Sequence, residues 1–97
     1  MVVAVEEPLR PPQARKLILA ILEQGAVEIS GHAEAELAKD RLTTVDAVNV
    51  LRGGFVSEPE REHGAWRYQV STNRITVVIE FNSETELTIV TAWRTSK

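Results

Sequence analysis

The spacing of apolar residues changes near residue 55, and this change constrains the fold more than any other feature of the chain. Before it, apolar side chains recur at helical intervals, as they do in residues 14–22. After it, they alternate with polar side chains or form short runs typical of strands. We therefore predict an α+β fold, with N-terminal helices packed on one face of a twisted antiparallel four-stranded sheet.

The first predicted helix follows a proline-containing arm over residues 1–12. Because proline fixes the backbone and lacks an N–H group, we expect no helix until the chain has passed Pro8, Pro11 and Pro12, the last of which suits a first helical turn. The helix is predicted over residues 13–25, since Gly25 is a natural helix end. Its predicted buried face consists of Ala14, Leu17, Ile18, Ile21 and Leu22.

Two further helices are predicted before residue 55. Ser30 is a plausible N-cap for a helix that ends near Arg41. The next helix is predicted to begin after Thr43 or Thr44, with Asp46 in its first turn. The residues predicted to share its buried side are Val45, Val48 and Leu51.

The second half of the chain is predicted to form the four strands. Phe55 starts a short strand that Pro59 weakens, so this strand belongs at an edge. The other strands are predicted at 66–70, 74–81 and 87–93. Short connections, such as a turn at His63-Gly64, favour an antiparallel meander. Residues 26–29 are predicted only as a short extended piece, and the sheet face away from the helices is predicted to be a partly open binding surface.

Length and composition favour one domain over residues 1–97. The hydrophobic content of 43% is that of an ordinary globular protein. The apolar run at the start lacks a basic leader and stops at Glu6, so we do not expect a signal peptide. No run reaches the ~20 apolar residues of a membrane span. The sequence has no cysteine. We therefore expect a cytoplasmic protein without a membrane partner.

The charge balance limits how the chain could bind nucleic acid. Lys and Arg number 11 and Asp and Glu number 14, so the net charge is −3. A broad electrostatic footprint for nucleic acid would require a basic protein. Any contact with RNA would therefore depend on a few locally placed Arg and His residues.

A small set of residues could carry metal-free chemistry on RNA. His32 stands at a predicted helix start, where its imidazole could face a phosphate. Arg67 and Arg94 lie on predicted strands and could hold and stabilise that phosphate, with the Tyr68 hydroxyl assisting. With two histidines and no cysteine, we expect no metal site and no cofactor. Two further candidates on the last strand are Thr91 and Trp93.

Each candidate also has a structural interpretation. His32 could form a helix-surface pair with Glu36, and Arg67 could be a solvent-facing residue opposite Glu80. Arg94 could simply mark the end of the chain. Aromatic residues in strands are more often packing groups than base-stacking platforms, and here these are Trp66, Tyr68 and Trp93. A charged strand edge that discourages pairing would explain the alternating Glu58, Glu60 and Glu62.

Several short stretches, read in order, resemble a small uncharacterised branch of the RelE/ParE toxin superfamily. The stretches are His32-Ala33-x-x-x-Leu37, Leu42-Thr43, Val45, Val48, Val50-Leu51, Gly54, Arg67-Tyr68, Ile75 to Ile79 and Thr91-Ala92-Trp93-Arg94. The resemblance covers roughly residues 29–94 and leaves the helix at 13–25 as an extra element. It implies a compact sheet with packed helices, like the RelE, ParE and MqsR toxins.

The resemblance also implies a function. The chain would be the toxin of a type II toxin–antitoxin pair and a metal-independent endoribonuclease. Its partners would be a cognate antitoxin and mRNA, either free or on the ribosome. The toxin would be a monomer or a dimer. The catalytic positions would be His32, Arg67, Tyr68 and Arg94. The substrate-binding positions would be Thr91, Trp93 and Arg41.

Two alternatives remain open at this point. Relatives often carry arginine where this chain has Glu36, and a second basic residue where it has Asp40, a place that Arg41 could fill. Glu36 cannot bind a phosphate as arginine does. The acidic balance and Glu36 favour a non-catalytic protein-interaction module of the same fold. A ParE-type gyrase inhibitor is the other alternative.

Overall fold

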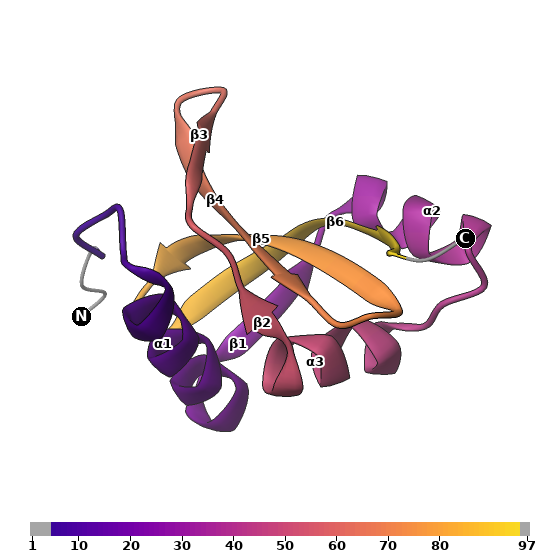
Figure 1. The fold of residues 1–97 in the computed structure, drawn as a ribbon, viewed down its shortest axis with the longest axis horizontal. Coiled ribbons are helices and arrows are strands. Elements are labelled where there is room, and N and C mark those ends of the chain that lie inside the picture. Colours follow the sequence, from indigo (N-terminus) through magenta and orange to yellow (C-terminus); the bar gives the residue numbers. More distant parts are fainter. Residues whose placement is uncertain (1–4, 96–97) are drawn as a thin grey trace.

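The computed structural model describes residues 5–95, which form three helices and six strands (Figure 1). In chain order the elements are α1 (Pro11–Gln24), β1 (Ala26–Ile29), α2 (Gly31–Lys39), α3 (Thr44–Gly53), β2 (Phe55–Val56), β3 (Glu60–Glu62), β4 (Ala65–Ser71), β5 (Ile75–Ser83) and β6 (Glu86–Arg94). The α+β class, with helices before most of the strands, is confirmed.

The sheet has more strands than predicted. Its order is β1-β6-β5-β4-β2, and β3 pairs with β4 off this path. All pairs are antiparallel except β1 with β6, which run parallel. The prediction of four strands was therefore wrong. The extended piece at 26–29 joins the sheet as β1, because a partner some 60 residues later in the chain supplies its hydrogen bonds.

The predicted cap of α2 and the predicted start of α3 after Thr43 are confirmed, and hydrogen bonds cap both helices. The Ser30 hydroxyl accepts a hydrogen bond from the Ala33 N–H at 3.0 Å. The Thr43 hydroxyl accepts one from the Asp46 N–H at 3.2 Å, and the Asp46 carboxylate accepts one from the Thr43 N–H at 2.8 Å. This reciprocal pair satisfies two backbone donors that a helix start would otherwise leave unpaired.

Helix α1 matches its predicted position to within two residues. It begins at Pro11, so both prolines lie in the first turn, where a missing N–H costs no helical hydrogen bond. The N–H of Gly25 closes the helix on the Ile21 carbonyl at 2.7 Å. The predicted face is confirmed, since the fully buried residues are Ala14, Ile18 and Ile21.

The predicted buried side of α3 was wrong at its first position. Val45 is 66% exposed, although it is apolar. Helix α3 packs against α1, β4 and β5, and the side facing them carries Ala47, Val50 and Leu51. Val45 lies in the first turn. With 3.6 residues per turn, its side chain points to a different side of the helix from this buried stripe.

The core lies between the helices and one sheet face. Buried side chains of all three helices join alternate residues of the strands in a single cluster. The strand residues in it are Val56, Tyr68, Val70, Val77, Ile79, Phe81, Leu87, Ile89 and Ala92. Since side chains alternate along a strand, the residues between these point to the other face.

Candidate functional site

The open face of the sheet carries a row of polar and aromatic side chains on its central strands. Gln69 on β4 lies beside Val78 on β5, and Val78 lies beside Thr91 on β6. Trp93 lies two residues further along β6, opposite Thr76. These side chains stand on three adjacent, fully paired strands, so their spacing is fixed by the sheet.

A hairpin forms the wall of this face. Strand β3 and the first residues of β4 project away from the rest of the sheet (Figure 1). The two-residue turn between them, His63-Gly64, has positive φ at both positions, 52° and 80°. That conformation matches the twist of a tight hairpin, so the predicted turn is confirmed.

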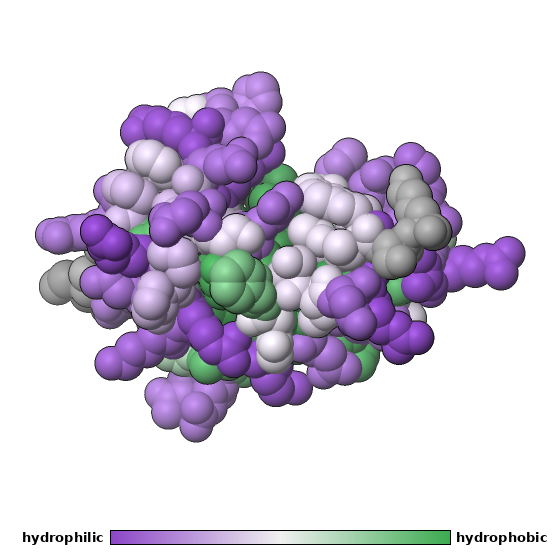
Figure 2. Space-filling model, viewed as in Figure 1, coloured by the Kyte–Doolittle hydropathy of each residue, from purple (hydrophilic) through white to green (hydrophobic). Residues whose placement is uncertain are grey.

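The wall and the sheet enclose a cleft of about 230 Å³. In the space-filling view the outline of the molecule is hollowed between the projecting hairpin and α2 (Figure 2). The hairpin itself is covered by hydrophilic side chains in this view. The cleft is lined by Glu58, Glu60, Glu62, Arg67, Gln69, Val78, Thr91 and Trp93.

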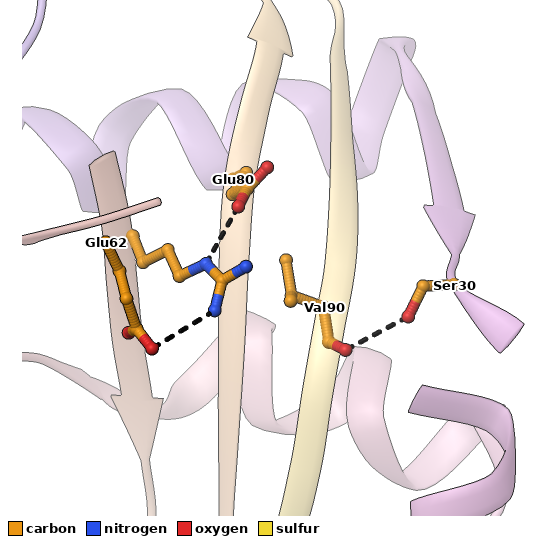
Figure 3. Close-up of polar contacts among 5 residues, drawn as sticks. Ser30, Glu62, Glu80 and Val90 are labelled. Carbon is orange, nitrogen blue, oxygen red and sulfur yellow. Dashed lines mark hydrogen bonds and ion pairs between the residues drawn. The ribbon is translucent and has the colours of Figure 1, made fainter. Parts of the chain in front are cut away.

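Arg67 is held in the cleft by two carboxylates. Its Nε donates to a carboxylate oxygen of Glu80 at 2.8 Å, and its Nη1 lies 3.6 Å from a carboxylate oxygen of Glu62 (Figure 3). The structural interpretation of Arg67 as the partner of Glu80 is therefore confirmed. The Nε donor of Arg67 is thus used by Glu80, and the nearby Glu62 offsets the charge of the guanidinium further.

The cleft has a negative local charge. The three glutamates that line the cleft and the neighbouring Glu80 supply four carboxylates, against the single guanidinium of Arg67, an excess of three negative charges. Within residues 5–95, Glu58 and Glu60 form no ion pair. An anion entering the cleft would meet repulsion, whereas a cation would find unpaired carboxylates.

Tyr68 follows Arg67 in the chain but points to the opposite face. It is fully buried in the core and packs edge-on against Phe81, with ring centroids 5.0 Å apart. Its hydroxyl accepts a hydrogen bond from the Leu9 N–H and donates one to the Glu7 carboxylate, both at 2.9 Å. Tyr68 thus ties the N-terminal arm to the core and does not line the cleft.

Burial governs the ionisation of this contact. It raises the pKa of Tyr68 to about 12, the nearby Glu7 carboxylate raises it as well, and the hydrogen bond from Leu9 opposes the shift. Burial also raises the pKa of Glu7, with a smaller contribution from the charge of Glu80, while the Tyr68 hydroxyl opposes it. At neutral pH the hydroxyl therefore keeps its proton and remains a donor.

His32 stands exposed in the first turn of α2. This end of the helix is fixed to the sheet, because the Ser30 hydroxyl donates to the Val90 carbonyl of β6 at 3.0 Å (Figure 3). His32 is not among the residues that line the cleft. No hydrogen bond or ion pair within residues 5–95 involves its imidazole, so the proposed pair with Glu36 is not formed; Glu36 binds Lys39 instead, at 3.1 Å.

Arg94 and Arg41 lie at the other end of α2. The Arg94 Nε donates to the Asp40 carbonyl at 3.0 Å, and its N–H donates to the Asp40 carboxylate at 2.9 Å. Arg94 therefore caps the C-terminus of α2, where a positive charge is favourable. Arg41 follows with a φ of 56° and an exposed side chain.

Arg67 and Arg94 point to opposite faces of the sheet. Ala92 pairs with Val77 and both are buried on the core face. Arg94 comes two residues after Ala92 and therefore faces the same way. Among the predicted site residues, the cleft brings together Arg67, Thr91 and Trp93, and it does not include His32, Tyr68, Arg41 or Arg94.

The cleft also contains residues that sequence reasoning did not assign to a site. The glutamates at 58, 60 and 62 were interpreted as an edge that discourages pairing, but β3 does pair with β4. Their two-residue spacing was the available signal, because it places all three side chains on one side of an extended segment. Gln69 and Val78 also line the cleft and gave no separate signal.

Two negative findings apply to the described part of the chain. Residues 5–95 hold no group of three or more His, Cys, Asp or Glu side chains arranged to bind a metal ion. None of the three helices is both long and apolar enough to cross a bilayer.

Residues 29–94 match the model of a protein family described as a domain of unknown function, DUF4258. The chain belongs to this family. The DUF4258 region contains α2, α3 and every strand from β2 to β6, so the whole cleft lies inside it. Helix α1 and the arm that bonds to Tyr68 precede it. No curated protein and no solved structure matches the chain.

Proposed function

We propose that this chain is a non-catalytic protein-interaction module that binds its partner through the cleft on the open sheet face. The cleft is rigidly built, because its floor belongs to three paired strands and its wall to a hairpin with a tight turn. It combines an aromatic and an aliphatic side chain, Trp93 and Val78, with a rim of charged groups. This combination is typical of surfaces that recognise polypeptide.

The state of Arg67 is the observation that carries this proposal. The Arg67 Nε already donates to Glu80 and its Nη1 lies close to Glu62, so an incoming phosphate would have to use the remaining guanidinium N–H groups beside these two carboxylates. Both carboxylates would repel the phosphate at that position. The other predicted catalytic groups are not in the cleft: Tyr68 is buried in the core, and His32 and Arg94 lie elsewhere on the surface.

A ribonuclease toxin of a type II toxin–antitoxin pair is the second candidate function. One observation favours it: the exposed His32 sits at the N-terminus of a helix, where a phosphate would meet unpaired backbone donors. This candidate function includes the proposal that the fold is RelE/ParE-like. The packing of helices against a mostly antiparallel sheet supports that proposal. Under this proposal the partners would be mRNA and a cognate antitoxin.

Controlled expression separates the two candidates. We would produce the wild type and the His32→Ala variant in a bacterial host and map mRNA ends by primer extension. The interaction module predicts intact mRNA with both proteins. New mRNA ends that appear with the wild type and disappear with His32→Ala would establish the ribonuclease instead.

Partner capture tests the interaction module directly. Tagged wild type and the charge-reversed Glu60→Lys variant would be cross-linked in the producing cells, and the captured proteins quantified by mass spectrometry. Glu34→Lys is the matched control, since Glu34 is exposed on α2 away from the cleft. We expect one protein to be captured by wild type and control and lost by Glu60→Lys. Equal capture by all three proteins would contradict a role for the cleft.

A further inference from the structure

Strand β3 has a free edge beside the cleft. Within residues 5–95 its one partner is β4, with Glu60 opposite Arg67 and Glu62 opposite Ala65. In an antiparallel ladder every second backbone N–H and C=O points away from the partner strand. Because the two-residue turn makes Glu62 and Ala65 a hydrogen-bonded pair, the outer edge of this three-residue strand presents the backbone N–H and C=O of Arg61, and Pro59 before it adds a C=O but no N–H. An extended peptide can add to this short edge as a further strand.

The side chains of this segment are spaced for such a peptide. Glu58, Glu60 and Glu62 all line the cleft, as expected of residues two apart along an extended chain. A strand added to β3 would place its own alternate side chains on the same face, about 4.5–5.5 Å from these glutamates between Cβ atoms. Cationic groups at every second position of the peptide would then each meet a carboxylate.

Charge and floor both favour lysine or arginine at those positions. Glu58 and Glu60 have no counter-ion within residues 5–95, and Arg67, which stands opposite Glu60 on β4, is already paired with Glu80 and Glu62. The floor beyond the glutamates includes Val78 and Trp93. Long cationic side chains can cover such a surface with their methylene groups while their charged ends remain at the acidic rim.

The same glutamates exclude the commonest wrong partner of a free edge. A second copy of this chain would bring an identical row of carboxylates against β3, and like charges directly opposite each other are destabilising. Hence β3 disfavours pairing with the β3 strand of a second copy and favours pairing with a strand of opposite charge. This resolves the apparent conflict between a charged edge and a binding edge.

We propose, on the basis of the interaction function above, that the partner contributes an extended segment with Lys or Arg at alternate positions, which pairs with the free edge of β3 and places its cationic side chains in the cleft. The backbone pairing gives the orientation of the segment, and the alternate charges give its specificity. The occupant is a polypeptide strand of a different protein.

A peptide titration tests this inference. The probe is a short peptide with lysine at every second position and threonine between, titrated into the purified chain by calorimetry. Two control peptides have the same composition, one with its lysines contiguous and one N-methylated on alternate backbone nitrogens so that strand pairing is blocked. We expect both controls to bind about tenfold more weakly than the probe, and probe binding to weaken as salt screens the charges.

Protein variants complete the design. Replacing Glu58, Glu60 and Glu62 together by glutamine should weaken probe binding about tenfold, whereas Glu34→Gln should leave it unchanged. Amide signals of β3 should shift in NMR spectra on addition of the probe, and those of α1 should not. Equal binding of probe and N-methylated peptide, or of wild type and triple variant, would overturn the inference.

The outcome can be separated from that of the proposed function. A partner captured through Glu60, together with failure of the probe peptide, overturns the strand-pairing inference and leaves the interaction module intact. Specific binding of the probe peptide supports the inference, and capture that does not depend on Glu60 removes the function on which it rests.

Discussion

Arg67 and Tyr68 are neighbours in the chain, yet they lie in two unlike regions of the molecule. The Tyr68 side chain is fully buried among helices and strands, and its single polar group is satisfied by the N-terminal arm. The Arg67 side chain lies in an acidic cleft and is paired with carboxylates. One face of the sheet thus holds the fold together, whereas the other is free to bind.

This difference predicts how substitutions should divide. On the covered face, apolar contacts dominate, so changes there should alter the free energy of unfolding. On the open face, side chains have few neighbours to lose, so changes there should alter binding and leave stability nearly unchanged. The following experiments test that division, beginning with the largest expected effect.

Ile79→Ala should be the most destabilising change. Ile79 is fully buried on the covered face, and truncation of such a residue leaves a cavity. We expect a loss of about 2–5 kcal/mol in the free energy of unfolding, measured by urea denaturation. Gln69→Ala on the open face is the control and should change stability by no more than about 0.5 kcal/mol. Similar losses from both variants would mean that the faces do not differ.

Adjacent glycines offer a second test. A Cβ at Gly54 would lie 2.6 Å from the Val50 carbonyl oxygen and 2.9 Å from a Val70 methyl group, so Gly54→Ala must push α3 away from β4. A Cβ at Gly53 would meet nothing within 4 Å. We expect a loss of about 1–3 kcal/mol for Gly54→Ala and no loss for Gly53→Ala, from the same denaturation curves. Equal behaviour of the two variants would argue against this close contact.

The chain has one tyrosine, so its ionisation can be followed without interference from another phenol. We predict that the absorbance of the phenolate of Tyr68 titrates with a midpoint of about 12, and near 10 in denaturant. Because the folded-state pKa is the higher one, this group stabilises the fold fully below pH 10 and loses that contribution as pH rises through 12. A folded-state midpoint near 10 would show that Tyr68 is not buried.

The ion pair of Arg67 and Glu80 should have the smallest effect on stability. Both side chains are partly exposed, at 23% and 27%, so water and salt screen their attraction. Glu80→Gln should lower the free energy of unfolding by about 0.2–1 kcal/mol, and by less at high salt. Glu84→Gln, at an exposed position without an ion pair in residues 5–95, is the control. A larger loss in the free energy of unfolding would show that the ion pair is buried and not screened by water.

Local signals in the sequence predicted much of the fold. Each of these features depends on a few neighbouring residues: the cap at Ser30, the start of α3 after Thr43, the apolar stripe of α1 and the turn at His63-Gly64. For this reason they could be read without knowing the rest of the structure. The position of Val45 was missed, because which side of a short helix is buried depends on what packs against it.

Non-local pairing explains the rest of the errors. Strand β1 forms only by pairing with β6, and no sequence signal near residue 26 predicts that pairing. A register shift in the β5–β6 ladder beside Val78 changes which residues of β6 face outward, so the directions of Thr91 and Arg94 could not be read from alternation alone. By contrast, the separation of Arg67 from Tyr68 was predictable, since adjacent strand residues point to opposite faces.

The most direct test of the open face as a protein-binding surface is photo-cross-linking in producing cells. A photoreactive residue would replace Gln69, which is exposed in the cleft, or Glu23, which is exposed on α1, and adducts would be analysed for protein and RNA. We predict a discrete protein adduct from position 69 and none from position 23. Adducts of RNA at position 69, or no protein adduct there, would contradict the account.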